Sequence, residues 1–570
     1  MKASDAVAKF LAEHHVNSCF ELVGGMITHL LDSLAEDGRF DIISMHHEQS
    51  AAFAAEGFAR QTMGKRMAVA MGTSGPGTTN LVTGIGSCWF DSVPCLFITG
   101  QVNTNELKGE RAIRQQGFQE LDIIPMVDSI TKYAHQVTDP NLLLPTLHHA
   151  MSVALSGRQG PALVDIPNDV QRMEIPDSVV EEWLRKPLQL ENSLPFDMAA
   201  SNALSQLCLK AKRPLICLGG GARWSASMPE FLKMLEHNCV PYVSTLMGHE
   251  RVVSSNCYFN MLGSYGNREA NWAVQNCDLL IVVGSRMDVR QTGSDTSDFA
   301  RNAKVVQVDI DLAQLNNRVC ADLSIQSDAE TFFVNFPVNN TTFPVKQMDW
   351  LTNLIALRSL SAVDEYADWE ISPSVLFAML NKVMTSRPVD YVCDVGNHMM
   401  WAAHNIRLEK NQAVHYSGGM GAMGFALPTA LGIANSSGQK TIIITGDGSL
   451  QVNIQELDTL ARLQQNVAII VLNNYSLGMV KNFQDMYFDG RDQSTKNGYS
   501  CPLFADLAKA YQIKGISVSC IVELEKAIRE IASATGPILL EVRMPSATEC
   551  RPRLAFGKKL DEQVPTINLN

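Results

Sequence analysis

Two polar residues follow two apolar segments of this chain, and their types suit the binding of a metal ion and a diphosphate. Asp447 lies in Gly446-Asp447-Gly448-Ser449, directly after the β-branched segment 441–445, and Asn474 follows the apolar segment 467–472. Apolar side chains at helical spacing separate them, so the stretch predicts a strand–helix–strand unit. Because parallel strands end at one edge of a sheet, we expect Asp447 and Asn474 to meet there. Their oxygens suit Mg²⁺ holding a diphosphate, although Gly-Asp-Gly is also a common turn.

Glu48 is the main candidate for proton transfer. It ends the predicted strand 41–48 and opens a helix whose other residues are mostly small or apolar. We therefore expect its carboxyl to be partly buried, which raises a carboxyl pKa toward values useful for proton transfer. An acid in the first turn of a helix can also simply stabilise the helix dipole.

Two further strand ends in the first third of the chain suggest contacts with a ligand. The segment 72–80, with the sequence GTSGPGTTN, is a glycine-rich turn between a strand and a helix. Such a turn can cradle a phosphate, although many of these turns bind nothing. Gln101 ends the next predicted strand, where it could form a hydrogen bond to a substrate or an intermediate.

Composition excludes several classes of function. The net charge of -13 and the lack of a basic cluster argue against a nucleic-acid partner. No uncharged apolar stretch of about 18 residues occurs, so we expect no membrane span. The first 16 residues predict an amphipathic helix rather than a signal peptide. The 13 cysteines lack metal-binding spacing and fit reduced thiols, which favours the cytoplasm.

Strand and helix patterns alternate along the whole chain, which predicts an α/β fold made of parallel sheets. A chain of 570 residues is too long for a single core. Proline-rich or polar passages at 175–195 and 338–348 divide it. We therefore predict three domains, at 1–168, 196–336 and 350–546, followed by an extended tail at 547–570.

Several motifs in order resemble one enzyme family. They are HHEQSAAFAAEGFAR, GTSGPGTTNLVTGIGSCWFDSVPCLFITGQV, GFQELDI, GGMGAMGFALPTALG and the GDGS…LNN pair. The chain resembles the catalytic subunit of acetohydroxyacid synthase (acetolactate synthase), a thiamine diphosphate enzyme, over roughly residues 1 to 545. The resemblance implies pyrimidine-binding, central flavin-type and diphosphate-binding domains. It implies an Mg²⁺-dependent carboligase that decarboxylates pyruvate, the donor substrate, and transfers the two-carbon unit to a 2-oxo acid. It also implies a homodimer or homotetramer with active sites between subunits, while a regulatory subunit remains open.

The resemblance also assigns roles to individual residues. Glu48 would protonate the aminopyrimidine of the cofactor, whose imino form then deprotonates the thiazolium carbon. Met423 would be the apolar wedge that bends the cofactor, although a methionine there could simply pack. Residues implied to line the reaction site are Gln101, Phe118, Gln119 and Lys132, and those implied to bind the metal are Asp447, Asn474 and Ser476. Those implied to bind thiamine diphosphate are Gly25, Gly75, Asn80, Asn397, His398, Gly421, Met423, Gly446, Gly448, Ser449, Leu477, Gly478 and Met479.

In the central domain the resemblance implies FAD, which does no net redox work in this family. The turn Gly219-Gly220-Gly221 and the acidic segment with Asp309 and Asp311 are each weak signals when read alone. Arg286, Asp288 and Arg290 complete the implied flavin contacts. Arg286 also matches the family arginine that faces the carboxylate of the acceptor, a bidentate role for which lysine is a poor substitute.

The chain departs from the family at positions that bear on the acceptor. Segment 261–266 reads MLGSYG where the family often has MLGMHG, and Phe483 replaces a tryptophan common in biosynthetic members. The predicted substrate contacts are Arg286, Met479 and Phe483. A phenylalanine ring is smaller than the indole of tryptophan, and such a change in pocket volume shifts the discrimination between acceptor substrates by about 1–3 kcal/mol. The tail is closer to relatives that transfer the two-carbon unit to a nucleotide-linked keto-sugar. The sequence also leaves open a pyruvate oxidase, a simple decarboxylase and a non-catalytic homologue.

Overall fold

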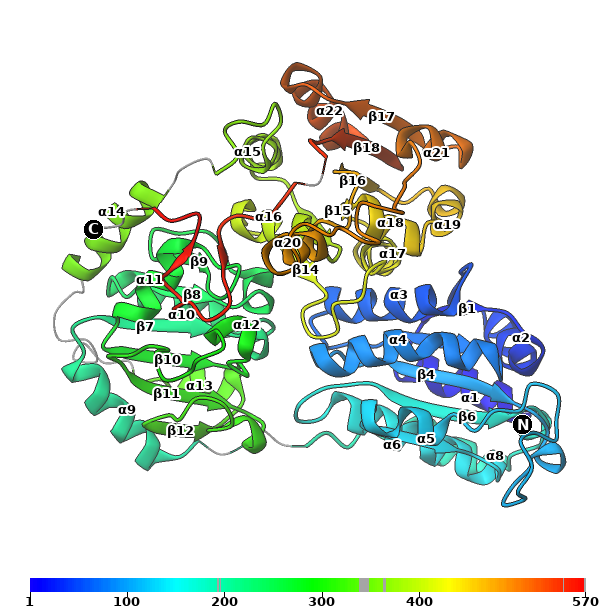
Figure 1. Cartoon of the computed structure of the whole chain (residues 1–570). Helices are drawn as coiled ribbons and strands as arrows, with labels where there is room; N and C mark the ends of the chain where they lie inside the picture. Colours follow the sequence, from blue (N-terminus) through cyan, green and yellow to red (C-terminus); the bar gives the residue numbers. More distant parts are fainter. Residues whose placement is uncertain (192–193, 195, 338–347, 362–364, 547, 568–570) are drawn as a thin grey trace.

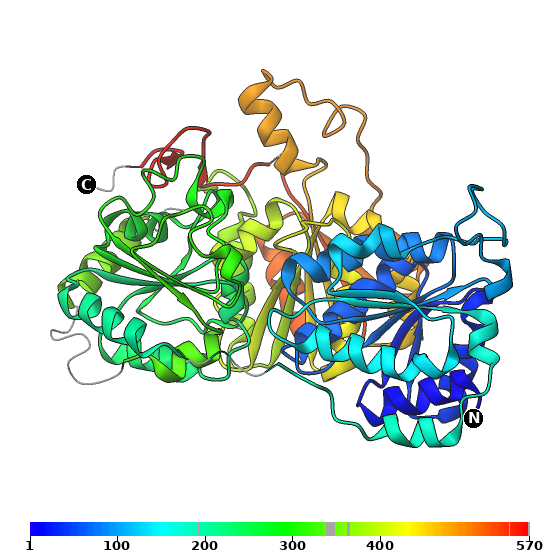
Figure 2. The same cartoon turned by 90° about the horizontal axis from the view of Figure 1, so that it is seen from below.

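The chain folds into three lobes, each built on its own sheet of six parallel strands (Figure 1). The computed structural model describes residues 1–191, 194, 196–337, 348–361, 365–546 and 548–567. This arrangement confirms the predicted α/β fold with three parallel-sheet domains. Figure 2, turned by 90°, shows the central lobe beside the N-terminal lobe, with the C-terminal lobe between and behind them.

The N-terminal domain has the strand order β2-β1-β3-β4-β6-β5. Its strands are β1 (Ser18–Leu22), β2 (Asp41–Ser44), β3 (Val69–Gly72), β4 (Leu96–Gln101), β5 (Tyr133–Gln136) and β6 (Ala162–Pro167). Its helices are α1 (Ala3–Glu13), α2 (Thr28–Asp37), α3 (Glu48–Gln61), α4 (Pro76–Asp91), α5 (Ile124–Val127), α6 (Leu143–Leu155), α7 (Asn168–Arg172) and α8 (Asp177–Leu184). The last of these lies in the passage predicted as a linker, and it packs on the domain through the buried Val180.

The C-terminal domain repeats this topology, with the order β14-β13-β15-β16-β18-β17. Its strands are β13 (Val389–Cys393), β14 (Gln412–Tyr416), β15 (Lys440–Gly446), β16 (Val467–Asn473), β17 (Lys514–Val518) and β18 (Ile538–Arg543). Its helices are α15 (Pro373–Met384), α16 (Asn397–Asn405), α17 (Ala426–Ser437), α18 (Asp447–Val452), α19 (Glu456–Leu463), α20 (Gly478–Tyr487), α21 (Phe504–Ala510) and α22 (Ile521–Ser533). β15 and β16 are neighbours, as the strand–helix–strand prediction requires.

The central domain has the order β12-β11-β10-β7-β8-β9, which is that of a dinucleotide-binding sheet read from its far edge. Its strands are β7 (Pro214–Leu218), β8 (Tyr242–Ser244), β9 (Tyr258–Met261), β10 (Leu279–Val283), β11 (Lys304–Asp309) and β12 (Leu323–Gln326). Its helices are α9 (Met198–Lys210), α10 (Met228–His237), α11 (Arg268–Asn276), α12 (Val289–Thr292), α13 (Ala329–Asn335) and α14 (Met348–Ser361). The strand order reverses between β7 and β10, where such sheets bind ligands.

The predicted start of the third domain at residue 350 is wrong. Trp350 and Leu354 of α14 are buried in the core of the central domain, and the Trp350 indole donates a hydrogen bond to the carbonyl of Pro214. The predicted linker at 338–348 lies outside the described residues except for its last residue. The third domain therefore begins after α14.

The tail also does more than extend into solvent. Its short strands β19 (Arg553–Leu554) and β20 (Gln563–Val564) pair in antiparallel fashion and lie on the central domain, where the tail is drawn in red in Figure 1. Leu560 is buried in the central core, and the Leu554 amide donates to the carbonyl of Ser264. The tail thus ties the C-terminal domain back to the central one.

Helices α3 and α17 join the N- and C-terminal domains at very short range. A Cβ atom added to Gly432 would lie 1.8 Å from the carbonyl oxygen of Ala54, and one added to Gly57 would lie 2.1 Å from that of Thr429. The two glycines therefore allow a helix crossing that no side chain would permit. Next to this crossing, Phe53 and Phe425 pack edge to face with their ring centroids 5.6 Å apart.

Candidate functional site

The predicted metal-binding residues converge at the carboxyl ends of β15 and β16. Asp447 is the first residue of α18, and its Oδ2 accepts hydrogen bonds from the Ser476 amide and the Tyr499 hydroxyl, each at 3.1 Å. One end of the Asn474 side-chain amide lies 2.9 Å from the Ser476 carbonyl oxygen and 3.2 Å from Asp447 Oδ1. With the amide oxygen at that end, three oxygens face one point, an arrangement that a hard divalent cation satisfies.

Burial shapes the chemistry of Asp447. The carboxyl is 2% exposed, and this burial raises its pKa to about 6, although the bonds from Tyr499 and the neighbouring amides act in the opposite direction. A bound cation would favour the ionised form. No cluster of three or more His, Cys, Asp or Glu side chains suited to a metal occurs in the described part of the chain, so an Asp–Asn–carbonyl set is the best-formed candidate.

A pocket of about 130 Å³ adjoins this oxygen cluster. The pocket is lined by the three predicted metal ligands, Asp447, Asn474 and Ser476, and by most of the cofactor contacts predicted for this domain. These contacts are Asn397, His398, Met423, Gly446, Gly448, Ser449, Leu477, Gly478 and Met479. Gly421 does not line the pocket, but it precedes Met423 by two residues in the same loop and has a positive φ of 65°. The structure thus brings nearly all the residues predicted from the C-terminal domain to the wall of one pocket.

Two buried polar atoms in the pocket have no partner in the described chain, namely His398 Nε2 and Asn397 Oδ1. Burial lowers the pKa of His398 to about 3, so the ring is neutral near pH 7. Unpaired buried polar atoms are costly, and a polar ligand such as a diphosphate with its metal would satisfy them. The pocket residues thus fit thiamine diphosphate with Mg²⁺.

A second group of predicted residues gathers at the carboxyl edge of the N-terminal sheet. Glu48 is the first residue of α3, is 5% exposed, and accepts a hydrogen bond of 2.9 Å from the Asn80 amide. Gly75 precedes α4 with a φ of 68°, and a Cβ atom there would lie 3.1 Å from the Gln119 carbonyl oxygen. Phe118 beside it is 80% exposed, and Gly25 is exposed at the same end of the domain.

These two groups do not line one pocket within the described chain. Every residue that lines the C-terminal pocket comes from positions 395–480, so Glu48 is absent from its wall. We call the group around Glu48 and the pocket beside Asp447 the two half-sites.

Gln101 and Lys132 do not join either half-site. The Gln101 amide nitrogen donates to the Leu121 carbonyl and to Asp165, its oxygen accepts from the Val102 amide, and the side chain is 1% exposed. Lys132 Nζ donates to the Ser156 carbonyl, and burial lowers its pKa. Gln101 is therefore committed to internal bonds rather than aimed at a substrate.

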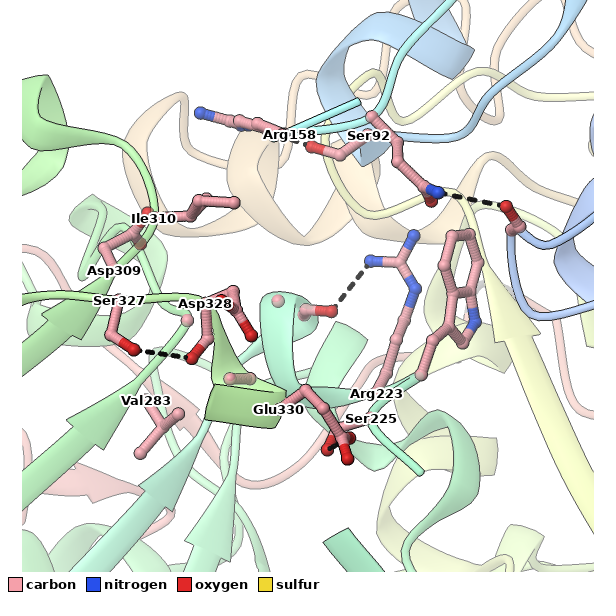
Figure 3. A pocket seen from close by; sticks show the side chains of 18 of the residues that line it. Ser92, Arg158, Arg223, Ser225, Val283, Asp309, Ile310, Ser327, Asp328 and Glu330 are labelled. Atoms are coloured by element: carbon pink, nitrogen blue, oxygen red, sulfur yellow. Dashed lines mark hydrogen bonds between the residues drawn. The ribbon is translucent and has the colours of Figure 1, made fainter. Parts of the chain in front are cut away.

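A larger cavity of about 550 Å³ lies between the N-terminal and central domains (Figure 3). It opens at the β7–β10 switch point and is lined by Gly220, Gly221, Arg286 and Asp309 among others. Arg158 of the N-terminal domain donates to Ser92 Oγ at 3.0 Å and pairs with Asp311 at 3.1 Å across the cavity. Burial raises the pKa of Asp309, whose carboxylate accepts the Asp311 amide.

Close packing between two loops is enough to explain why glycines occur beside this cavity, whether or not a ligand binds there. A Cβ atom on Gly219 would lie 2.1 Å from the Gly284 carbonyl oxygen, because the loops after β7 and β10 pack on each other. The fit to a flavin dinucleotide therefore rests on the switch point, the cavity size and the acidic groups after β11 rather than on the glycines alone.

The residues predicted to contact the acceptor substrate lie in two separate parts of the structure. Arg286 lines the interdomain cavity and an adjoining one of about 130 Å³ that also contains Asp288 and Arg290, and it pairs with Asp288 at 3.1 Å. Met479 lines the pocket beside Asp447, whereas Phe483 is 52% exposed and packs against Tyr487 with ring centroids 4.7 Å apart. The structure thus places Phe483 on the outer face of α20.

Two partners of the candidate metal ligands could not be predicted from the sequence. Tyr499 contacts Asp447 from a loop beyond α20, and Thr548 contacts both Asn474 and Asn397 from the tail. Neither residue lies in a recognisable motif, and both reach the site only through the tertiary fold. Trp401 also lines the pocket.

Family models match all three domains. The models describe the N-terminal TPP binding domain, the central domain and the C-terminal TPP binding domain of thiamine pyrophosphate enzymes, and they cover residues 1–126, 201–335 and 394–542. The chain therefore belongs to the thiamine pyrophosphate (thiamine diphosphate) enzymes.

Comparison with individual relatives shows which family within this class the chain belongs to. The chain is 34% identical to the acetolactate synthase isozyme 2 large subunit of Escherichia coli K12, with 100% of each protein covered. It is 33% identical to the acetolactate synthase large subunit of Cyanidium caldarium, over 99% of this chain and 97% of the relative. It is 32% identical to the probable acetolactate synthase large subunit of Methanocaldococcus jannaschii, over 100% and 96%. Within the class, this chain is thus a member of the acetolactate synthase large-subunit family.

Proposed function

We propose that this protein is a thiamine diphosphate- and Mg²⁺-dependent carboligase that decarboxylates pyruvate and transfers the two-carbon unit to a 2-oxo acid. The observation that carries the proposal is the convergence of Asp447, Asn474 and the Ser476 carbonyl beside a pocket lined by nearly all the cofactor contacts expected from the C-terminal domain. Family membership supports the same reading.

Bound thiamine diphosphate would supply a carbon nucleophile and hold the electron pair that loss of CO₂ leaves behind. Asp447, Asn474 and Ser476 would hold Mg²⁺ and, through it, the diphosphate. Met423 would press on the cofactor from the glycine-rich loop, and Glu48, held by Asn80, would exchange the proton that activates the cofactor. The buried side chains that line the pocket, among them Asn397, Asp447 and Asn474, would limit access of water to the reacting carbon.

A complete site requires two chains in this proposal. The pocket wall contains no residue of the N-terminal domain in the described chain, so Glu48 of one subunit would act on the cofactor held by its partner. A homodimer is the smallest assembly that supplies both halves, and a homotetramer would contain two such pairs. The relatives are named large subunits, so a smaller regulatory subunit is a further partner to test.

The interdomain cavity would hold FAD as a structural group. Arg286, which lines this cavity, would face the carboxylate of the acceptor, which favours pyruvate or another 2-oxo acid. Thirteen free cysteines, most of them buried, fit a reducing compartment, and we place the enzyme in the cytoplasm. The described chain contains no helix long and apolar enough to cross a membrane.

The test is to incubate purified protein with pyruvate, thiamine diphosphate, Mg²⁺ and FAD and to identify the products by mass. We expect 2-acetolactate and CO₂ from pyruvate alone. Slow CO₂ release without acetolactate would shift the acceptor to another ketone, such as a nucleotide-linked keto-sugar. Acetaldehyde as the main product would indicate a decarboxylase, and bleaching of the flavin by pyruvate would indicate an oxidase.

A further inference from the structure

A buried cluster of charged side chains joins all three domains beside the proposed active site. Arg60 of α3 is fully buried and pairs with Glu56, Asp91 and Glu250 at 2.6, 2.7 and 3.3 Å. Glu250, in the turn Met247–Arg251 of the central domain, also pairs with Arg223 at 2.8 Å. From β14 of the C-terminal domain, His415 lies 2.8 Å from Glu250.

Asp91 differs from the other two carboxylates of this cluster, because it also holds the backbone of the glycine-rich loop. Its Oδ1 accepts a hydrogen bond from the Gly419 amide at 2.7 Å, and its Oδ2 accepts one from the Gly418 amide at 3.2 Å. Both amides belong to the loop 417–424 that carries Met423 into the pocket. Asp91, at the end of α4 in the N-terminal domain, thus connects the charge cluster with the glycine-rich loop of the C-terminal domain.

The close approach of this loop depends on the lack of side chains at its first glycines. A Cβ atom on Gly418 would lie 2.4 Å from Met247 Sδ, and one on Gly419 would lie 2.6 Å from Phe90 Cβ. The loop is therefore seated on the end of α4 and on the central domain, with the Asp91 carboxylate as its hydrogen-bonding anchor. Its other end is held in the same way, because the Gly424 and Ala426 amides donate to the buried Asp394.

A comparison of Glu56 with Asp91 separates an effect on the position of the loop from an effect on the stability of the fold. It is buried like Asp91 and pairs with the same guanidinium, but its described bonds do not include the glycine-rich loop. Loss of either carboxylate leaves Arg60 with one counter-charge fewer in the protein interior. Only loss of Asp91 also leaves two loop amides without their acceptor.

We propose that Asp91 is a positioning residue, which fixes the loop 417–424 and with it Met423 against the bound cofactor. This inference rests on the proposed function, since it assigns Met423 to thiamine diphosphate. In Asp91→Asn the new amide nitrogen faces donors, so at least one loop amide loses its bond. The loop then has to be ordered by the cofactor itself, which weakens cofactor binding.

The test compares the intact protein with its Asp91→Asn and Glu56→Gln variants. Thiamine diphosphate binding in the presence of Mg²⁺ is measured by calorimetry and checked through intrinsic tryptophan fluorescence, to which Trp401 in the pocket wall contributes. Thermal unfolding is measured in parallel. We expect Asp91→Asn to raise the dissociation constant for thiamine diphosphate roughly tenfold to a hundredfold. Glu56→Gln should lower the unfolding temperature comparably and leave the affinity for thiamine diphosphate nearly unchanged.

Equal weakening of thiamine diphosphate binding in both variants would overturn the proposal, because the cluster would then act only through general stability. Failure of the intact protein to bind thiamine diphosphate would instead refute the proposed function, which keeps the two failures distinct.

Discussion

Two variants that are each inactive should restore activity when they are paired, if the active site lies between two chains. Glu48→Gln removes the proton-transfer group and Asp447→Asn removes the charged metal ligand, and the two residues lie in separate half-sites of one chain. A heterodimer of these variants contains one site with both residues altered and one with both intact. It should therefore show about half of the wild-type activity per dimer, whereas each homodimer should lose roughly 100-fold or more.

Co-expression with two different affinity tags and sequential purification isolates the heterodimer, and acetolactate formation reports its activity. The matched control is a heterodimer of the intact chain with the double variant Glu48→Gln/Asp447→Asn. Sites between chains make this control inactive, whereas sites within one chain make it about half active. An active control together with an inactive mixed heterodimer would refute the division of the site between subunits.

Three further predictions follow from individual residues. Burial raises the pKa of Asp447 to about 6, and the cation needs the ionised carboxylate, so Mg²⁺ affinity should level off well above pH 6 and fall toward about tenfold per pH unit well below it. Calorimetric titration from pH 5 to 8 tests this, and a flat profile would contradict it. Gly432→Ala puts a Cβ atom 1.8 Å from the Ala54 carbonyl oxygen and should lower the free energy of unfolding by at least about 1–3 kcal/mol, measured by denaturant titration, with Gly438→Ala near a solvent-facing helix end as a milder comparison. Leu560→Ala should cost about 2–5 kcal/mol, because the tail leucine is buried in the central core; an unchanged denaturation midpoint would show that the tail does not stabilise that domain.

The sequence predicts those parts of the fold and site that local patterns and strand topology determine. Asp447 and Asn474 could be paired because each follows a buried strand and parallel strands end together. The boundary at α14 could not be placed, because a helix of ambiguous periodicity between two domains can pack on either, and Trp350 and Leu354 pack on the central one. The tail was predicted as extended because its short strands β19 and β20 have little local pattern.

Contacts between distant segments are the part that the sequence does not reveal. Tyr499 and Thr548 reach the metal site through loops without motifs. Asp91 looks like an ordinary end of a helix until the fold brings Arg60 and the amides of Gly418 and Gly419 to it. Gln101 was predicted to contact a substrate because it ends a strand. In the structure its side-chain amide instead forms hydrogen bonds within the protein, to Leu121 and Asp165.

The most direct test of the account is whether the pocket beside Asp447 binds thiamine diphosphate through a metal. Calorimetric titration of thiamine diphosphate into the intact protein should show binding with Mg²⁺ and little or none after removal of divalent cations. The Asp447→Asn variant should lose most of this affinity with its fold intact by circular dichroism, since the change keeps the size of a buried side chain. Equal affinity with and without Mg²⁺, or in the intact protein and the variant, would contradict the assignment of this site.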